Sequence, residues 1–215
     1  MKWLRYVGLL LLTVICAMLV MAGHYYYKGF HKARSPEFKA SKNTDEAEIN
    51  KISQKALLLK KFASEKKYNQ NICFLADMSL SSGKNRFFVY NISKDSIIAS
   101  ALVAHGSGDN GFSLYPKFSN QCESGCSSLG KYKIGQPYNG RFGASYKLYG
   151  LDSTNSNAFR RNVVLHSYDC VPPQETYPYP ICNSRGCAMV SPEFMKQLQV
   201  ILNGNRQPIL LWIFN

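Results

Sequence analysis

Short apolar runs separated by turn residues fill the chain from Cys73 to its end, and they limit the folds that it can adopt. Such runs lie at residues 73–78, 87–92 and 97–104, with turns rich in Gly, Ser and Asn between them. Strands this short and closely spaced predict a mainly β fold, an antiparallel β-sandwich or barrel with a few helices. The other expected strands are residues 132–134, 145–151, 162–166 and 207–214.

Two helices are expected beside these strands. Residues 192–202 follow Ser191, which suits the N-cap, and Gly204 lies just beyond their end. Residues 45–67 repeat apolar side chains at spacings of three and four, which predicts an amphipathic helix. Packing of this helix on the following domain is the favoured interpretation, and binding to a partner or to a membrane surface is the alternative.

The chain begins with an apolar run at residues 6–22, preceded by Lys2 and Arg5. A cleaved secretory signal has a basic start, an apolar centre and small residues before the cut. A membrane anchor needs about 17–25 apolar residues, and the three tyrosines at 25–27 would then lie at the interface. The run is longer than the roughly 7–15 apolar residues of a usual signal, which favours an apolar helix retained as an inner-membrane anchor.

These segments predict three parts: a signal peptide or anchor at 1–27, a basic linker with the amphipathic helix at 28–71, and a folded domain at 72–215. The formal net charge of +13 invites a nucleic-acid partner. However, the sequence holds no helix-turn-helix, zinc-finger or RNP pattern. An anionic lipid or cell-wall partner explains the charge as well. We therefore expect no nucleic-acid partner, and a domain exported to the periplasm or cell envelope.

One histidine and one cysteine suggest the chemistry of the domain. His166 closes an apolar run, and Cys187 directly follows Gly186. A free thiol has a pKa near about 8.5, so a cysteine nucleophile needs a base or a positive field beside it. We interpret Cys187 as the nucleophile and His166 as its base, against the commoner case in which two such residues meet only by packing. The small residues Ser184 and Gly186 would let backbone N–H groups approach a reacting carbonyl, as an oxyanion hole requires.

These residues resemble one enzyme family. His166, followed at this distance by Ser184-Arg185-Gly186-Cys187, is similar to the signature of the L,D-transpeptidases, the YkuD-type cysteine enzymes that cross-link peptidoglycan. Residues 127–135 resemble the strand that leads toward the active site of that family. The resemblance covers about residues 73–215. Three further segments resemble a divergent branch, the murein L,D-transpeptidase catalytic-domain-like proteins: residues 103–108, 148–152 and 155–158.

The resemblance implies acyl transfer on peptidoglycan stem peptides without a cofactor. The Cys187 thiolate would attack the carbonyl of a meso-diaminopimelate-type residue in a tetrapeptide stem, release the terminal D-alanine and form a thioester. An acceptor amine would resolve the thioester as a cross-link, and water would resolve it in an L,D-carboxypeptidase. Two other classes stay open: a catalytically inactive, membrane-tethered wall-binding module, and a cysteine peptidase that acts on proteins.

The sequence departs from the family pattern beside the nucleophile. Arg185 stands where the commonest members have a second histidine, and residues 188–190 replace the usual continuation. A guanidinium group can hold a carboxylate by two hydrogen bonds, so Arg185 is a candidate substrate-binding residue, unless it only faces solvent. His105 and Tyr168 are the other candidates, with a structural, hydrogen-bonded histidine as the alternative for His105. Ser184 is also a candidate for orienting the imidazole.

The seven cysteines bear on the compartment. Cys122 with Cys126, and Cys170 with Cys182, are each close enough in sequence to pair. In an oxidising compartment, a bond between Cys170 and Cys182 would pin the loop between the histidine and the nucleophile. Zinc bound by four cysteines and the histidine is the alternative, but no Cys-x-x-Cys pattern is present. We therefore expect disulfides and no metal.

Overall fold

The computed structural model describes residues 2–31, 45–108 and 111–215. The chain divides into two compact units, residues 1–37 and 38–215. The first unit holds α1 (Lys2–His31), which contains the predicted signal or anchor segment. Among the described residues, no helix combines the length and the apolarity that a membrane span requires. Residues 32–44, which belong to the predicted basic linker, lie outside the described residues.

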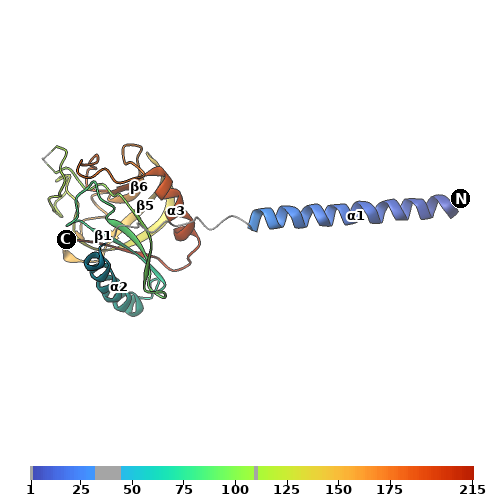
Figure 1. The fold of residues 1–215 in the computed structure, drawn as a ribbon, viewed down its shortest axis with the longest axis horizontal. Helices are drawn as coiled ribbons and strands as arrows, with labels where there is room; N and C mark the ends of the chain where they lie inside the picture. Colours follow the sequence, from blue (N-terminus) through green and yellow to red (C-terminus); the bar gives the residue numbers. More distant parts are fainter. Residues whose placement is uncertain (1, 32–44, 109–110) are drawn as a thin grey trace. The chain divides into compact units, whose positions relative to one another are not determined.

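An eight-stranded sheet organises the second unit (Figure 1). Its strands, in chain order, are β1 (Ile72–Asp77), β2 (Phe87–Asn91), β3 (Ser96–Ala101), β4 (Gly130–Gly140), β5 (Gly143–Gly150), β6 (Val164–Ser167), β7 (Ala188–Val190) and β8 (Leu210–Phe214). The helices are α2 (Glu46–Lys66), α3 (Pro192–Asn203) and a short 3₁₀ helix, η1 (Ser153–Asn155).

The strand order is β3-β2-β1-β8-β4-β5-β6-β7. Five of the seven neighbouring pairs are antiparallel, and the pairs β1–β8 and β6–β7 are parallel. The predicted mainly β fold with a few helices is confirmed. The expectation was an antiparallel sandwich or barrel, and the strands form one mostly antiparallel, mixed sheet that their ladders do not close.

Both faces of the central strands are buried. Alternation along β1 sends Phe74 and Ala76 to one core cluster and Cys73 and Leu75 to the other. Helix α3 packs in the first cluster and α2 in the second, next to β1 (Figure 1). This double cover explains why these strands are continuous apolar runs in the sequence. The buried side chains of α2 are Ile52, Ala56, Leu59 and Ala63.

The amphipathic helix therefore packs on the domain and contributes to its core. Its four buried positions follow the three-and-four spacing seen in the sequence. The compact unit that contains the sheet spans residues 38–215 and so includes α2.

The segment after β3 is bonded to β7, at the opposite edge of the sheet. The Ala104 N–H donates to the Met189 carbonyl oxygen at 2.8 Å, and the Ser184 N–H donates to the His105 carbonyl oxygen at 2.8 Å. The Ser107 N–H donates in turn to the Ser184 carbonyl oxygen at 2.9 Å. We call this set of bonds the seam. It fixes the residues just before Cys187 against the sheet.

A glycine is required in the seam. A Cβ atom on Gly106 would lie 2.2 Å from the carbonyl oxygen of Gly125, which is too close for any side chain. The Gly106 N–H also donates to Ser127 Oγ at 2.9 Å. Residues 104–107, 125–127 and 184 therefore meet here by close backbone packing. Two of the segments that resemble the enzyme family, residues 103–108 and 127–135, thus have a structural role.

Candidate active site

The parallel pairing of β6 with β7 places His166 and Cys187 on one face. His166 is the register partner of Met189, and register partners point to the same side of a sheet. Cys187 lies two residues before Met189, so it faces that side too. Leu165 and Ala188, which point the other way, enter the main core cluster. The two residues that the sequence singled out are thus brought together by adjacent strands.

A cavity of about 440 Å³ opens on this face. Six of the predicted site residues line it: His166, Tyr168, Ser184, Arg185, Cys187 and the disulfide candidate Cys170. No site role was predicted for the other lining residues, which are Arg141, Phe142, Asn183 and Met189. A thiol and an imidazole therefore share one space that is large enough for an acyl group.

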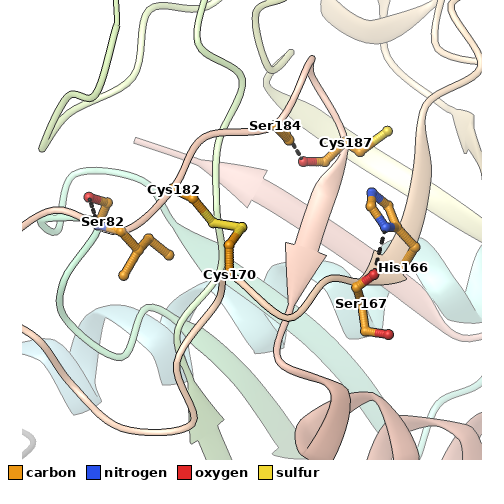
Figure 2. The surroundings of a disulfide bond; sticks show 8 residues. Ser82, His166, Ser167, Cys170, Cys182, Ser184 and Cys187 are labelled. Atoms are coloured by element: carbon orange, nitrogen blue, oxygen red, sulfur yellow. Dashed lines mark hydrogen bonds between the residues drawn. A yellow bond between two sulfur atoms is a disulfide. The ribbon is translucent and has the colours of Figure 1, made fainter. Parts of the chain in front are cut away.

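The imidazole of His166 is held in one tautomer. Its Nδ1 lies 3.0 Å from the carbonyl oxygen of Ser167, which can only accept, so Nδ1 carries the proton of the neutral ring. The other nitrogen, Nε2, then bears the lone pair, and Figure 2 shows it on the side of the ring that faces Cys187. Phe142 stacks on the ring with centroids 4.8 Å apart. Burial lowers the pKa of His166, and the bond to Ser167 opposes this only in part.

The Cys187 thiol is half-buried and lies beside the start of β6. Its Sγ is 3.9 Å from the Asn162 carbonyl oxygen, and among the described residues no hydrogen bond joins it to His166. Burial raises the pKa of Cys187, and the Val164 N–H and the charges of Arg161 and Lys147 offset this only in part. A raised thiol pKa and a lowered imidazole pKa both favour a neutral pair over a thiolate–imidazolium pair.

The pH dependence of thiol alkylation tests this protonation state. Because the neutral pair is favoured, the alkylation rate of Cys187 by iodoacetamide should keep rising as the pH passes about 8.5, the ordinary thiol pKa. The rate is measured by mass spectrometry of the peptide that contains Cys187. A plateau reached below about pH 7 would instead indicate a preformed thiolate.

Ser184 holds the turn before the nucleophile. Its Oγ donates to the Cys187 carbonyl oxygen at 2.7 Å (Figure 2). It also accepts from the Gly186 N–H at 3.1 Å. It therefore does not orient His166, and the Ser167 carbonyl takes that role instead. The Gly186 N–H is likewise engaged, so it is not the free oxyanion donor that the sequence suggested. Gly186 is needed for its backbone, because its φ of +111° suits only glycine.

His105 lies in the interior and does not line the cavity. Arg86 Nη2 donates to its Nδ1 at 2.7 Å, and both side chains are fully buried. Burial, together with the charge of Arg86, lowers the pKa of His105 to about 4, so the ring is neutral at physiological pH. The predicted substrate contact through this side chain is therefore not available. Its backbone contributes instead, through the seam.

One of the two cysteine pairs is bonded. Cys170 and Cys182 form a disulfide that spans the loop between the two catalytic candidates (Figure 2). Cys122 and Cys126 are both free thiols. Cys126 is buried, whereas Cys122 is exposed and accepts a hydrogen bond from Arg160 Nε at 3.1 Å. The two thiols thus lie in different surroundings despite their close spacing.

Removal of the disulfide should destabilise the protein. The bond closes a loop with a sequence separation of 12, and a loop of this length corresponds to about 3 kcal/mol of unfolding free energy. We expect a loss of this size in urea denaturation of the variant carrying Cys170→Ser and Cys182→Ser. The single change Cys122→Ser, at an exposed free thiol, should alter stability by less than about 0.5 kcal/mol. Equal stability of the double variant and the wild type would contradict this role.

The site residues that sequence analysis missed carry no distinguishing sequence pattern. Phe142 lies between β4 and β5, where the neighbouring Gly143 signals only a turn. The Ser167 carbonyl is a backbone group that every residue carries. Asn162 was read as part of a strand, but it has a positive φ of 54° and ends the turn before β6.

Comparison with known proteins gives one family match. Residues 43–212 match the model described as "L,D-transpeptidase catalytic domain". No curated protein matches the chain.

Several solved structures show a distant likeness. The Ldtfm-avibactam carbamoyl enzyme is 11% identical over 68% of this chain, with a TM-score of 0.43, and the match spans only 50% of that protein. An L,D-transpeptidase from Xylanimonas cellulosilytica is 11% identical over 72% of this chain and 68% of that protein, with a TM-score of 0.39. An L,D-transpeptidase from Mycobacterium tuberculosis is 13% identical over 67% of this chain and 58% of that protein, with a TM-score of 0.36.

Proposed function

Because this chain belongs to the L,D-transpeptidase catalytic-domain family, we propose that it is a cysteine-dependent acyltransferase acting on peptidoglycan stem peptides. The observation that carries the proposal is the shared cavity. In it, the thiol of Cys187 and the imidazole of His166 face the same space from adjacent strands. The Ser167 carbonyl leaves the basic nitrogen of the ring on the side of the thiol.

The first half-reaction forms a thioester. His166 Nε2 takes the thiol proton as Cys187 Sγ attacks the carbonyl carbon of the meso-diaminopimelate-type residue in a tetrapeptide stem. Collapse of the tetrahedral intermediate breaks the C–N bond to the terminal D-alanine. The imidazolium returns its proton to the leaving amine, so the base ends the step neutral. A resting neutral pair suits this sequence, because proton transfer accompanies attack.

The second half-reaction releases the acyl group. The amine of another stem attacks the thioester carbonyl carbon while His166 takes its proton. Collapse of the intermediate breaks the C–S bond, the proton returns to the Cys187 sulfur, and the cross-link is released. Attack by water in the same way gives an L,D-carboxypeptidase instead. In both half-reactions the developing oxyanion needs an N–H donor. Since the Gly186 N–H donates to Ser184, we assign this role to the Cys187 N–H. Tyr168 and Arg185, which line the cavity, are assigned to the substrate.

Peptidoglycan lies outside the cytoplasm, so the proposed function requires export. A disulfide between Cys170 and Cys182 is consistent with an oxidising compartment. The apolar segment that follows Lys2 and Arg5 supports an export signal. We therefore place the catalytic domain in the periplasm or cell envelope.

Incubation of the purified protein with tetrapeptide muropeptides tests the proposal. Mass spectrometry should show either dimers with loss of one D-alanine, for a transpeptidase, or monomers that have lost D-alanine, for a carboxypeptidase. Binding to peptidoglycan without any turnover would instead indicate a wall-binding module. Cleavage of an unfolded protein substrate, with muropeptides untouched, would indicate a cysteine peptidase.

A further inference from the structure

A second, larger hollow adjoins the cavity of the nucleophile. It has a volume of about 800 Å³ and shares Arg185 with the catalytic cavity. Arg160, Arg161 and Asn162 line it from the turn before β6, and Cys122, Glu123 and Gly125 line it from the opposite side. The proposed mechanism assigns no role to this hollow.

The hollow carries an excess of positive charge. Three guanidinium groups line it, against the single carboxylate of Glu123. Among the described residues, none of the three arginines forms an ion pair. The Lys147 ammonium adds charge nearby, since its Nζ donates to Asn162 Oδ1 at 2.8 Å. An anion entering the hollow would therefore meet cations that have no carboxylate partner.

The three arginines differ in their exposure and in the hydrogen bonds that hold them. Arg161 is half-buried, and its Nη1 donates to the Ser119 carbonyl oxygen at 2.8 Å while its Nη2 donates to the Cys126 carbonyl oxygen. Its position is thereby fixed. Arg160 and Arg185 are exposed, and the one hydrogen bond found for Arg160 goes to the weak acceptor Cys122 Sγ. Both exposed guanidinium groups can donate hydrogen bonds to a carboxylate, and Arg161 adds a third positive charge to the lining.

The hollow lies directly beside the reacting thiol. Asn162 lines it, and the Asn162 carbonyl oxygen is 3.9 Å from Cys187 Sγ. A Cβ atom on Gly186 would lie 3.1 Å from Arg161 Nη2, so this guanidinium group lies close to the backbone of the nucleophile turn. A substrate whose carbonyl lies at the thiol can therefore place a neighbouring anionic group in the hollow.

We propose that this hollow, built by Arg160, Arg161 and Arg185, is a carboxylate-binding subsite for a peptide whose free carboxylate lies close to the scissile carbonyl. The substrate class rests on the proposed function, since stem peptides carry such carboxylates. The preference of the subsite for anions does not depend on turnover, so it can be measured separately.

Alkylation of Cys187 by a charged and a neutral reagent of similar size measures this preference. Iodoacetate places a carboxylate next to its reacting carbon, and iodoacetamide places a neutral amide there. We expect the ratio of the two rates at Cys187, read by peptide mass mapping, to exceed the same ratio for N-acetylcysteine. Arg160→Gln should lower the ratio about fivefold with little change in the iodoacetamide rate, and Arg185→Gln should lower the ratio by a similar factor. Arg160→Lys should retain most of the wild-type ratio, because lysine keeps the positive charge.

Two controls make the outcome decisive. Lys196→Gln, which removes an exposed charge on α3 away from the hollow, should leave the ratio unchanged. N-acetyl-D-alanine should slow alkylation of the wild type more than its amide does, and this difference should shrink in Arg160→Gln. Unchanged ratios in both arginine variants would overturn the subsite while leaving the acyltransferase proposal intact. A lowered ratio in a protein that turns over no muropeptide would support the subsite and reject the enzyme.

Discussion

Replacement of Cys187 by alanine should abolish acyl transfer on tetrapeptide muropeptides, with a loss of at least about 10³-fold. The sulfur is the atom that carries the acyl group, and no other free thiol lines the catalytic cavity in the described part of the chain. Intact-protein mass spectrometry should also show that a carbapenem adds covalently to the wild type and not to Cys187→Ala.

The matched control is Cys16→Ala, which removes an exposed free thiol on α1 and should leave both turnover and the adduct unchanged. Cys187 is half-buried, so Cys187→Ala should stay folded, and its thermal unfolding shows whether it does. Substantial turnover by a folded Cys187→Ala protein, above about a tenth of the wild-type rate, would remove the thioester from the mechanism.

Replacement of His166 by glutamine should lower the acylation rate by about 10²–10⁴-fold, the range for loss of a general base. Glutamine keeps a polar side chain of similar length, but it cannot accept the thiol proton. Because the Cys187 pKa is raised by burial, the thiol has no other means of ionising readily near neutral pH. Single-turnover formation of the thioester is the appropriate measurement, since it isolates the step in which the base acts.

The control for this variant is His24→Gln, at an exposed histidine of α1, which should behave as the wild type. The acylation rate of His166→Gln should also recover in part at high pH, where the thiol ionises without a base. Undiminished acylation by the folded variant near pH 7 would refute the assignment of His166 as the base.

Strands covered on both faces were predictable because their composition leaves few alternatives. The apolar runs that became β1, β2 and β8 were found within a few residues of their bounds, and the helical period of α2 matched its buried positions. β7 was not predicted, because three residues are too few to show a period. β4 extends to Gly140 through Pro137 with a register shift, where proline usually argues against a strand.

The candidate site was predictable only where chemistry requires a particular side chain. A thiol after a glycine and a histidine at the end of an apolar run are recognisable, and both line the cavity. Whether a side chain points into the core or into the cavity could not be predicted. His105 and Cys126 point inward because of packing contacts made by distant segments, which no local pattern records. The charged hollow escapes sequence analysis for the same reason, since Arg160 and Arg185 meet only in the fold.

The seam makes the turn before Cys187 an integral part of the sheet, although two of its segments have no strand of their own. Its backbone amides, those of Ala104, Ser107 and Ser184, are held by bonds between residues about eighty positions apart. Amides of this kind exchange with solvent deuterium only when a large cooperative unit opens. The turn before Cys187 should therefore not open separately from the sheet. Heat should destroy the reactivity of Cys187 and unfold the sheet in a single transition.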